Sequence, residues 1–296
     1  MRTIAIHTSK GGVGKTTLVV NIAYELARQG NRVLVVDLDD QANASLSLGV
    51  NKADEIEKVS TLREFRQILD SFKDRKEVID FLKMGTKETS LEECLTCIYP
   101  ASNWFNLDSE EGGKIDVLPG SYQTTPVNLP DSPTAPKFLD IQLQKLATEY
   151  DYVLMDTGPS YNLIAWNALY AAKYVIIPSQ MEYLSAQGIK TTSKNILDIQ
   201  LDTRKTRGKI LGIVPMMTDQ PGRDTLNKMV EGIIKGIFPD IQIFPKFNRS
   251  TYVAQASHKR MPLSLFAENN TSARTVAMQL IELTDELVER INSLEP

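Results

Sequence analysis

The chain of 296 residues has few of the residues on which many enzymes depend: two histidines, two cysteines and two tryptophans. His7 and His258 are too few and too far apart in the sequence to supply the base of a Ser-His-Asp hydrolase. No stretch approaches the roughly 20 consecutive apolar residues of a membrane-spanning helix. The N-terminus has no apolar region followed by a cleavage site, as a signal peptide would. We therefore expect a cytoplasmic protein without stable membrane association.

Cysteine is confined to one Cys-x-x-Cys pair, Cys94 and Cys97. A structural zinc site needs four ligands, and both histidines are remote in the sequence. We interpret the pair as two inert or partly buried thiols. A metal shared between two subunits, each of which gives one pair, is the alternative that the spacing leaves open.

Charge is spread unevenly along the chain. The formal net charge at pH 7 is −4, but residues 190–260 contain 13 Lys and Arg against 6 Asp and Glu, a local net charge of +7. All other residues together then carry −11. Such asymmetry is typical of a protein that presents one face to an anionic partner.

Short apolar runs typical of buried strands alternate with helical stretches. They cover residues 32–37, 115–118, 152–156, 174–178 and 210–215, with a weaker run at 241–244. This alternation predicts an α/β fold with a mostly parallel, doubly wound sheet and helices on both faces. We expect one domain over residues 1–296, in which residues 52–113 form an inserted helical region whose clearest helical stretch is 61–84. A C-terminal helix is expected over 272–291, and its acidic character argues against membrane binding.

The segment Ser9-Lys-Gly-Gly-Val-Gly-Lys-Thr-Thr17 lies between a predicted strand, residues 3–7, and a predicted helix that ends near Gly30. This strand–loop–helix context identifies a phosphate-binding loop, whose glycines let backbone N–H groups face an anion at the positive end of the helix. Lys15 is expected to reach the β- and γ-phosphates of a nucleotide, and the hydroxyl of Thr16 to hold Mg²⁺. The expected nucleotide contacts come from Lys10, Gly11, Gly12, Val13, Gly14, Lys15, Thr16 and Thr17.

Two of the predicted strands end in carboxylates at the sheet edge from which the phosphate-binding loop starts. Asp37, Asp39 and Asp40 follow one strand, and Asp156 ends another. Carboxylates this close repel one another unless a cation absorbs their charge, and a Mg²⁺–nucleotide supplies one. We expect Asp37 to hold a metal-bound water, Asp39 to orient the water that attacks the γ-phosphate, and Asp156 to act on the magnesium shell. Asp40 fits a turn or helix-capping role better, and Gly158 permits close backbone approach to the γ-phosphate.

These motifs together resemble the ParA/MinD family of deviant Walker-box ATPases, and further matches favour its ParA branch. The matching segments are Lys10–Thr17, Asp37–Asn43, Asp156–Ser160, Asn167–Leu169, Ile177–Tyr183 with Gly188, and Gly212–Asp219. The resemblance covers residues 2–50 and 115–265 and is weak over 52–113. It implies a P-loop NTPase fold, ATP and Mg²⁺ as cofactors, and slow ATP hydrolysis that a partner stimulates.

The resemblance also implies how the second loop lysine acts. In this family two subunits bind ATP face to face, and Lys10 matches the lysine that reaches the partner's nucleotide. Asp39 matches the water-positioning aspartate, and hydrolysis loosens the homodimer. The ATP-bound dimer of the family binds double-stranded DNA without sequence preference and responds to an adaptor, which is ParB-like or McdB-like. The resemblance thus implies a nucleoid-associated ATPase that positions a plasmid, a chromosome region or a carboxysome.

The chain departs from the family pattern at three places. Asp39–Asn43 reads Asp-Asp-Gln-Ala-Asn where the family has Asp-Pro-Gln-Gly-Asn, a change that bears on loop motion and hydrolysis rate. Gly158-Pro159 stands where the family has Pro-Pro. His7–Ser9 is similar to the McdA group, many of whose members use a distant lysine in place of the loop lysine. Lys190 or Lys194 is the candidate for such a second lysine here.

The basic excess offers candidates for DNA contact, because phosphate contacts need only a cationic surface. The candidates are Arg204, Lys205, Arg207, Lys209, Arg223, Lys246, Arg249, Lys259 and Arg260. Adenine is expected to lie against residues 216–219, with Met216 and Asp219 as its contacts, and against 245–248. Two other function classes stay open: a MinD-like membrane-recruited regulator, and an iron-protein-like carrier in which Cys94 and Cys97 bridge a cluster between subunits.

Overall fold

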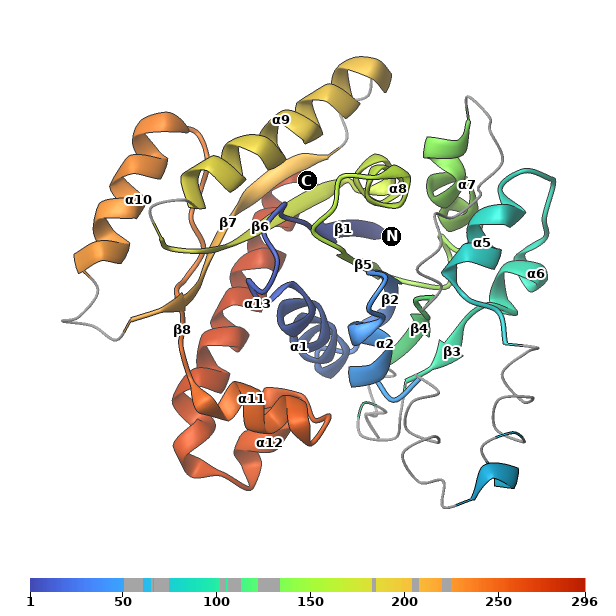
Figure 1. Ribbon diagram of the computed structural model, residues 1–296, viewed down its shortest axis with the longest axis horizontal. Coiled ribbons are helices and arrows are strands. Elements are labelled where there is room, and N and C mark those ends of the chain that lie inside the picture. Colours follow the sequence, from blue (N-terminus) through green and yellow to red (C-terminus); the bar gives the residue numbers. More distant parts are fainter. Residues whose placement is uncertain are drawn as a thin grey trace.

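The structure is a computed structural model whose described residues are 1–50, 61–64, 66, 75–101, 105, 113–121, 134–182, 185–203, 208–219 and 225–295. Among these residues eight strands form one sheet, in the spatial order β3-β4-β2-β5-β1-β6-β7-β8 (Figure 1). The strands are β1 (Arg2–Ile6), β2 (Arg32–Leu38), β3 (Tyr99–Pro100), β4 (Lys114–Leu118), β5 (Tyr152–Thr157), β6 (Tyr174–Gln180), β7 (Lys209–Thr218) and β8 (Phe247–Asn248). Neighbouring strands pair in parallel except β3 and β4, which are antiparallel. The predicted mostly parallel α/β fold is confirmed.

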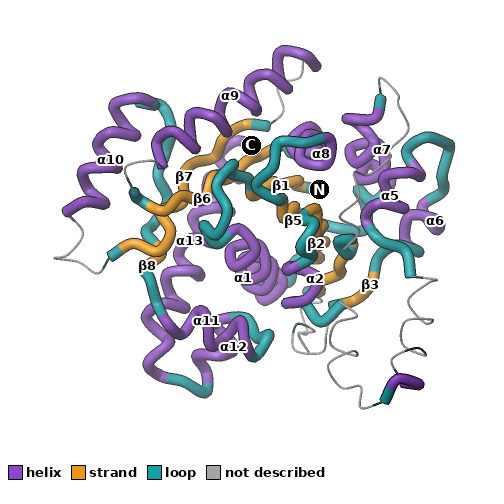
Figure 2. Tube along the Cα trace, viewed as in Figure 1, coloured by secondary structure: helices purple, strands orange, loops and turns teal. Residues whose placement is uncertain are grey.

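Helices cover both faces of this sheet (Figure 2). The described helices are α1 (Lys15–Arg28), α2 (Asn43–Ser47), α5 (Val78–Met84), α6 (Leu91–Leu95), α7 (Phe138–Lys145), α8 (Leu163–Ala171), α9 (Ser185–Thr203), α10 (Thr225–Ile237), α11 (Thr251–His258), α12 (Leu263–Glu268) and α13 (Arg274–Leu294). One face packs against α1, α2, α11, α12 and α13, and the other against α5 to α10. The sheet is therefore buried on both sides, which explains why its central strands are apolar throughout.

The alternation of side chains along each strand assigns its residues to the two layers. In β2, Val33 and Val35 belong to the core that includes α1 and α13, whereas Leu34 and Val36 belong to the core that includes α7 and α8. All four side chains are fully buried. The same strand therefore stabilises both layers, and it ends with Asp37 at the carboxyl edge of the sheet.

The strand register brings the acidic residues of the sequence to one place. Asp156 of β5 pairs with Asp37 of β2 on one side and with Ile6 of β1 on the other. The loop after β1 leads into α1 at this same edge (Figure 1). Parallel strands end at the same edge, so the sheet holds the phosphate-binding loop and the carboxylates within one site.

One expectation about local structure was wrong in detail. The weak strand at 241–244 is reduced to a bridge between Ile213 and Ile243, because Pro245 has no N–H to extend the ladder and β8 starts beyond it. Within the region 52–113, β3 adds a short antiparallel strand to the free edge of β4. Residues 51–60, 65 and 67–74 lie outside the described residues, so the predicted boundary at residue 52 and most of the helical stretch at 61–84 stay predictions.

The C-terminal helix α13 packs along the α1 layer with one apolar face buried, whereas Met278 is exposed. Its end is tied to the amino ends of two central strands: Arg2 Nε donates to Glu295 Oε2 at 3.1 Å, and the Tyr174 hydroxyl donates to Glu295 Oε1 at 2.9 Å. The two marked chain ends accordingly lie close together (Figure 1). Among the described helices, none is long and apolar enough to cross a membrane.

Candidate nucleotide-binding site

The phosphate-binding loop has the backbone shape that its glycines allow. Gly12 and Gly14 have φ angles of 70° and 90°, in the left-handed region that side chains disfavour. A Cβ at Gly14 would lie 2.7 Å from Cε of Met216, so the methionine side chain would have to shift to admit it. Because the loop runs directly into α1, its N–H groups stand at the positive end of that helix.

The two loop lysines have different environments. Lys15 is 6% exposed, and its Nζ donates to the backbone oxygen of Lys10 at 3.3 Å. Burial lowers its pKa, and the charges of Asp156 and Asp39 oppose that effect. Lys10 is partly exposed instead, and its Nζ lies 2.6 Å from Glu182 Oε2 and 3.1 Å from Gln180 Oε1. Lys15 thus folds back over its own loop, whereas Lys10 stands at the rim of the site.

Gln180 and Glu182 were not assigned a role from the sequence, although they lie within the segment 177–183 that matches the family. Gln180 Nε2 also donates to the carbonyl of Gly12 at 3.2 Å, so the residue joins the end of β6 to the loop. On the next helix, Oγ1 of Thr192 accepts from the backbone N–H of Ser9 at 3.3 Å. No local sequence signal predicts these contacts, because they join segments far apart in the chain.

Asp156 and Thr16 form the centre of the candidate metal site. The Thr16 hydroxyl donates to Asp156 Oδ2 at 2.6 Å, and the other oxygen, Oδ1, is buried with no partner among the described residues. Burial, followed by the charge of Asp37, raises the pKa of Asp156 well above its ordinary value. A buried carboxylate oxygen without a donor, beside a second carboxylate, fits a nearby divalent cation.

The described residues contain no group of three His, Cys, Asp or Glu side chains arranged to hold a metal ion without further ligands. A magnesium ion at this place would therefore take ligands from the Thr16 hydroxyl, from phosphate oxygens and from water, with Asp156 behind them. This is the usual way in which proteins bind Mg²⁺, since the ion keeps several waters and a few protein oxygens.

The carboxylate of Asp37 accepts hydrogen bonds from its own subunit that the sequence did not predict. Its Oδ2 accepts from the N–H of Ser45 at 2.8 Å and from the Ser45 hydroxyl at 2.7 Å, and its Oδ1 accepts from the N–H of Asp39 at 3.2 Å. Ser45 Oγ in turn accepts from the N–H of Gly120 at 2.9 Å. Burial raises the pKa of Asp37 to about 6, against the effect of these donors. Asp37 therefore anchors α2, a role that the hydroxyl at position 45 could have indicated.

Asp39 is half-buried and faces the glycine that follows the β5 strand. Its Oδ1 accepts from the N–H of Gln41 at 3.0 Å, and a Cβ at Gly158 would lie 3.7 Å from the same oxygen. Asp40 is exposed, in agreement with a turn role. Ala42, at the position where the family has glycine, has a left-handed φ of 48°. Ala42 thus adopts the left-handed backbone conformation that is expected of the glycine found there in the family.

The adenine candidates lie in different environments. Met216 is buried and packs behind Gly14. Asp219 is exposed, and its N–H donates to Oδ1 of Asn227 in α10 at 3.0 Å. Lys190 and Lys194 are exposed on α9, two positions on either side of Thr192, which contacts the loop. Two residues correspond to about 200° of helix rotation, so both lysines point away from the loop of their own subunit.

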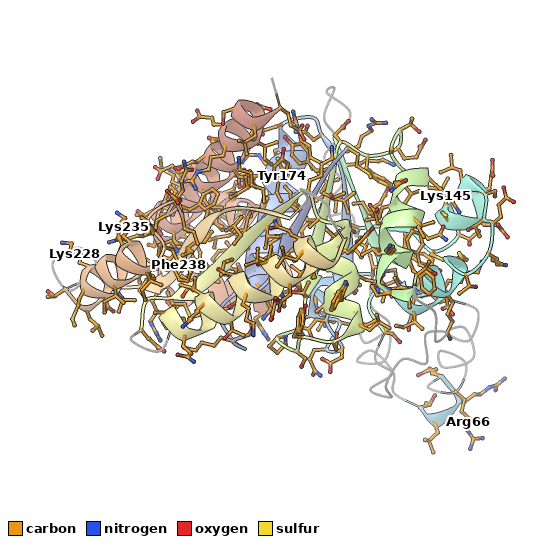
Figure 3. All side chains as sticks on the ribbon, turned by 90° about the horizontal axis from the view of Figure 1, so that it is seen from above. Arg66, Lys145, Tyr174, Lys228, Lys235 and Phe238 are labelled. Carbon is orange, nitrogen blue, oxygen red and sulfur yellow. The ribbon has the colours of Figure 1, made fainter. Side chains whose placement is uncertain are left out.

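Four of the DNA candidates, Arg204, Lys205, Arg207 and Arg223, lie outside the described residues. Arg249 precedes α11, and Lys259 and Arg260 follow it, so this helix of eight residues, about 12 Å long, separates them. Lys246 pairs with Glu231 of α10 at 3.6 Å. Lys209 is exposed at the start of β7. Further lysines, Lys228 and Lys235, extend from α10 at one end of the molecule (Figure 3). The structure therefore distributes the basic side chains over several surfaces.

Both cysteines are fully buried in the core that includes α5 and α7. The Cys94 thiol donates to Gln142 Oε1 at 3.2 Å. Burial raises the pKa of both thiols, that of Cys97 to about 11. These are the properties of packed, unreactive thiols, as expected from the sequence.

Comparisons with known proteins agree with this geometry. Residues 1–207 match a family model described as an AAA domain. The sporulation initiation inhibitor protein Soj of Bacillus subtilis is 30% identical over 91% of this chain and 93% of its own length. A solved ATP complex of McdA from Cyanothece covers 99% of this chain and 96% of its own, with a TM-score of 0.76 at 19% identity. MinD of Pyrococcus horikoshii, complexed with Mg-ADP, covers 97% and 95%, with a TM-score of 0.64 at 21% identity.

The two solved structures establish the fold, and the ligands named for them agree with the ATP and Mg²⁺ predicted from the phosphate-binding loop. The sequence similarity to Soj spans nearly the whole of both proteins. Together with the family match over most of the chain, it confirms the resemblance seen in the motifs. The chain belongs to the ParA/MinD family of deviant Walker-box ATPases, in its ParA branch.

Proposed function

We propose that this chain is an ATP-dependent switch that forms a nucleotide-sandwich homodimer, binds DNA without sequence preference and positions a cargo by adaptor-stimulated ATP hydrolysis. The main support is the contrast between its loop lysines. Lys15 is buried over its own loop, whereas Lys10 stands at the rim, held by Gln180 and Glu182. A lysine at the rim is suited to a phosphate that a second subunit presents.

Within one subunit, the N–H groups of Gly11–Gly14 and the ammonium of Lys15 bind the β- and γ-phosphates of ATP. Thr16 and Asp156 would hold Mg²⁺, and Asp37 would hold a metal-bound water. Bound Mg²⁺ supplies Lewis-acid stabilisation of phosphate charge. Asp39 orients the attacking water, and Gly158 lets the backbone approach the γ-phosphate. Met216 and Asp219 contribute to the adenine side of the site.

The DNA-binding part of the proposal rests on charge. The basic candidates provide phosphate contacts, and a dimer doubles their number, so that ATP-dependent dimerisation raises the affinity for DNA. Because contacts to phosphate carry no sequence information, such binding is non-specific. The protein then acts on nucleoid DNA in the cytoplasm. A ParB-like or McdB-like adaptor stimulates hydrolysis, and the cargo is a plasmid, a chromosome region or a carboxysome.

Two variants in a DNA-retention assay test this proposal. We expect wild-type protein to be retained on DNA with ATP but not with ADP, and retention to fall steeply with salt. Asp39→Ala keeps ATP-dependent dimerisation and DNA retention but loses turnover, whereas Lys10→Ala loses dimerisation. Equal retention on DNA with ATP, with ADP and without nucleotide would contradict the proposal. Rapid release of Asp39→Ala from DNA in ATP would contradict the role of that residue.

The two alternative functions have less support. A MinD-like membrane helix would need an available apolar face, but the continuous apolar face of α13, which runs from Val276 to Ile291, is buried in the core. An iron-protein-like cluster would need thiols at a subunit surface, but Cys94 and Cys97 are both buried. Sedimentation of the protein with anionic vesicles in ATP would support the MinD-like function. Iron found in anaerobically purified protein would support the iron-protein-like function.

A further inference from the structure

His7 lies within the candidate site but has no part in the chemistry proposed above. It follows β1 directly, its side chain is fully buried, and its N–H donates to the carbonyl of Ile176 in β6 at 3.1 Å. Its ring Nδ1 lies 2.8 Å from Oγ1 of Thr157, the last residue of β5. His7 therefore joins the carboxyl ends of the three central strands, β5, β1 and β6.

The hydrogen bonds of Thr157 decide which ring nitrogen of His7 carries the proton. The Thr157 hydroxyl donates its single hydrogen to the carbonyl of Ile6 at 2.9 Å, since a carbonyl can only accept. Nδ1 of His7 must therefore donate to Thr157. Burial, followed by the charge of Lys15, lowers the pKa of His7 to about 4, so the ring is neutral and Nε2 is its acceptor. Nε2 is buried and has no hydrogen-bond partner among the described residues. The ring is thus a neutral, directed donor.

Thr157 lies between two residues on which the proposed hydrolysis depends. Asp156, before it, accepts from the Thr16 hydroxyl, and Gly158, after it, faces Asp39 Oδ1. The Thr157 side chain is held by Ile6 on one side and by His7 on the other. These two bonds set the direction in which the chain leaves β5, and with it the position of Gly158 relative to the phosphate-binding loop.

We propose that His7 is a positioning residue for ATP hydrolysis, which holds the turn from Asp156 to Gly158 through its hydrogen bond to Thr157 and does not touch the nucleotide. The inference rests on the proposed function as an ATPase. A neutral ring suits this role because it supplies one donor without adding a second cation next to Lys15. ATP binding depends mainly on the loop N–H groups and Lys15, so loss of the bond lowers kcat and leaves ATP affinity nearly unchanged.

Substitutions on both sides of the bond test this inference. His7→Leu removes the donor, and Thr157→Val removes the acceptor while keeping the side-chain shape. His7→Asn keeps an amide N–H near the position of Nδ1, and Thr157→Ser keeps the hydroxyl, so these are the matched controls. We expect His7→Leu and Thr157→Val to lower single-turnover ATP hydrolysis by about tenfold or more, with unchanged affinity for a fluorescent ATP analogue. The two controls keep most of the wild-type rate.

The double variant His7→Leu/Thr157→Val separates positioning from independent effects. Thr157→Val removes the bond to His7 together with the one to the carbonyl of Ile6, so we expect the double variant to be no slower than Thr157→Val alone. Losses that multiply, or wild-type turnover in His7→Leu, would overturn the inference. Thr157→Val also removes the hydrogen bond to the carbonyl of Ile6. Should His7→Leu not fold, His7→Phe, which keeps a ring and lacks the donor, compared with His7→Asn therefore decides the question. Wild-type protein that neither binds nor hydrolyses ATP would instead contradict the proposed function.

Discussion

Two buried carboxylates dominate the electrostatics of the site at the level of single residues. Asp37 and Asp156 are fully buried and occupy paired positions on β2 and β5. Burial raises the pKa of both, because a charge is unfavourable away from water, and the charge of Asp37 adds to the effect on Asp156. For Asp37, a rise from 3.8 to about 6 corresponds to about 3 kcal/mol. The charged forms of both carboxylates are thus destabilised, mainly by burial, and a bound cation would relieve this.

The raised pKa of Asp156 predicts how stability depends on pH. A carboxylate with a raised folded-state pKa contributes its full stability below the unfolded value of 3.8, and stability is lost as pH rises through the folded pKa. Asp156→Asn removes the buried charge and keeps an acceptor for Thr16. In thermal unfolding without nucleotide, we expect it to be more stable than wild type near pH 8, with a smaller difference near pH 5. Asp240→Asn, at an exposed position, is the control, and an equal difference at both pH values would contradict the prediction.

At the level of elements, the loop between β2 and α2 depends on a glycine in another segment. Gly120 follows β4, and a Cβ added there would lie 3.0 Å from Cβ of Ala42 and 3.0 Å from Cγ of Asp37. Its N–H also donates to Ser45 in α2. Ala42, with its positive φ, occupies the space that this glycine leaves. The position of α2 is therefore fixed jointly by three segments of the chain.

We predict that Gly120→Ala lowers the free energy of unfolding by about 1–3 kcal/mol, because the added methyl overpacks the contact with Ala42 and Asp37. Ala42→Gly in the same chain is expected to restore part of the loss, since it removes the nearest atom. Denaturant unfolding measures both effects. The control is Gly232→Ala in α10, where a Cβ meets nothing within 4 Å; it should stabilise by about 0.5–1 kcal/mol. A Gly120→Ala variant as stable as wild type would contradict this prediction, because it would show that the loop between β2 and α2 accommodates the methyl group without loss of stability.

At the level of the whole molecule, the rim contact of Lys10 bears on assembly. Lys10 pairs with Glu182, which lies 172 positions away, and Glu182 is mostly exposed. In the proposed dimer Lys10 leaves this partner for the nucleotide of the second subunit. The ion pair within one subunit then competes with dimerisation.

Glu182→Gln is therefore expected to favour ATP-dependent dimerisation. An exposed ion pair contributes up to about 1 kcal/mol, and each homodimer breaks two of them, so the protein concentration for half dimerisation should fall by up to about 30-fold. Sedimentation with a non-hydrolysable ATP analogue measures this midpoint. Glu289→Gln, which removes the same charge from an exposed position of α13, should leave it unchanged. A weaker dimer in Glu182→Gln would mean that Glu182 stabilises the assembled state instead.

The elements that sequence patterns predicted well are those encoded within a short window. The strand, glycine loop and helix of residues 3–30, the apolar runs of β2, β5, β6 and β7, and the carboxylates at strand ends all depend on neighbours in the chain. The edge of the sheet was predicted less well. A two-residue strand such as Tyr99–Pro100 has too little periodicity to be recognised, and it forms because β4 offers an unpaired edge.

Residue types and their spacing were enough to establish the phosphate-binding loop, the parallel sheet and the family of this chain. Residue types and spacing did not predict which partner each polar side chain contacts. Thr16 meets Asp156 across 140 positions, Lys10 meets Glu182, and Asp37 is occupied by Ser45 because α2 folds back on it. Such pairs form where packing of the sheet and its two helical layers brings distant segments together, and no local pattern records that distance.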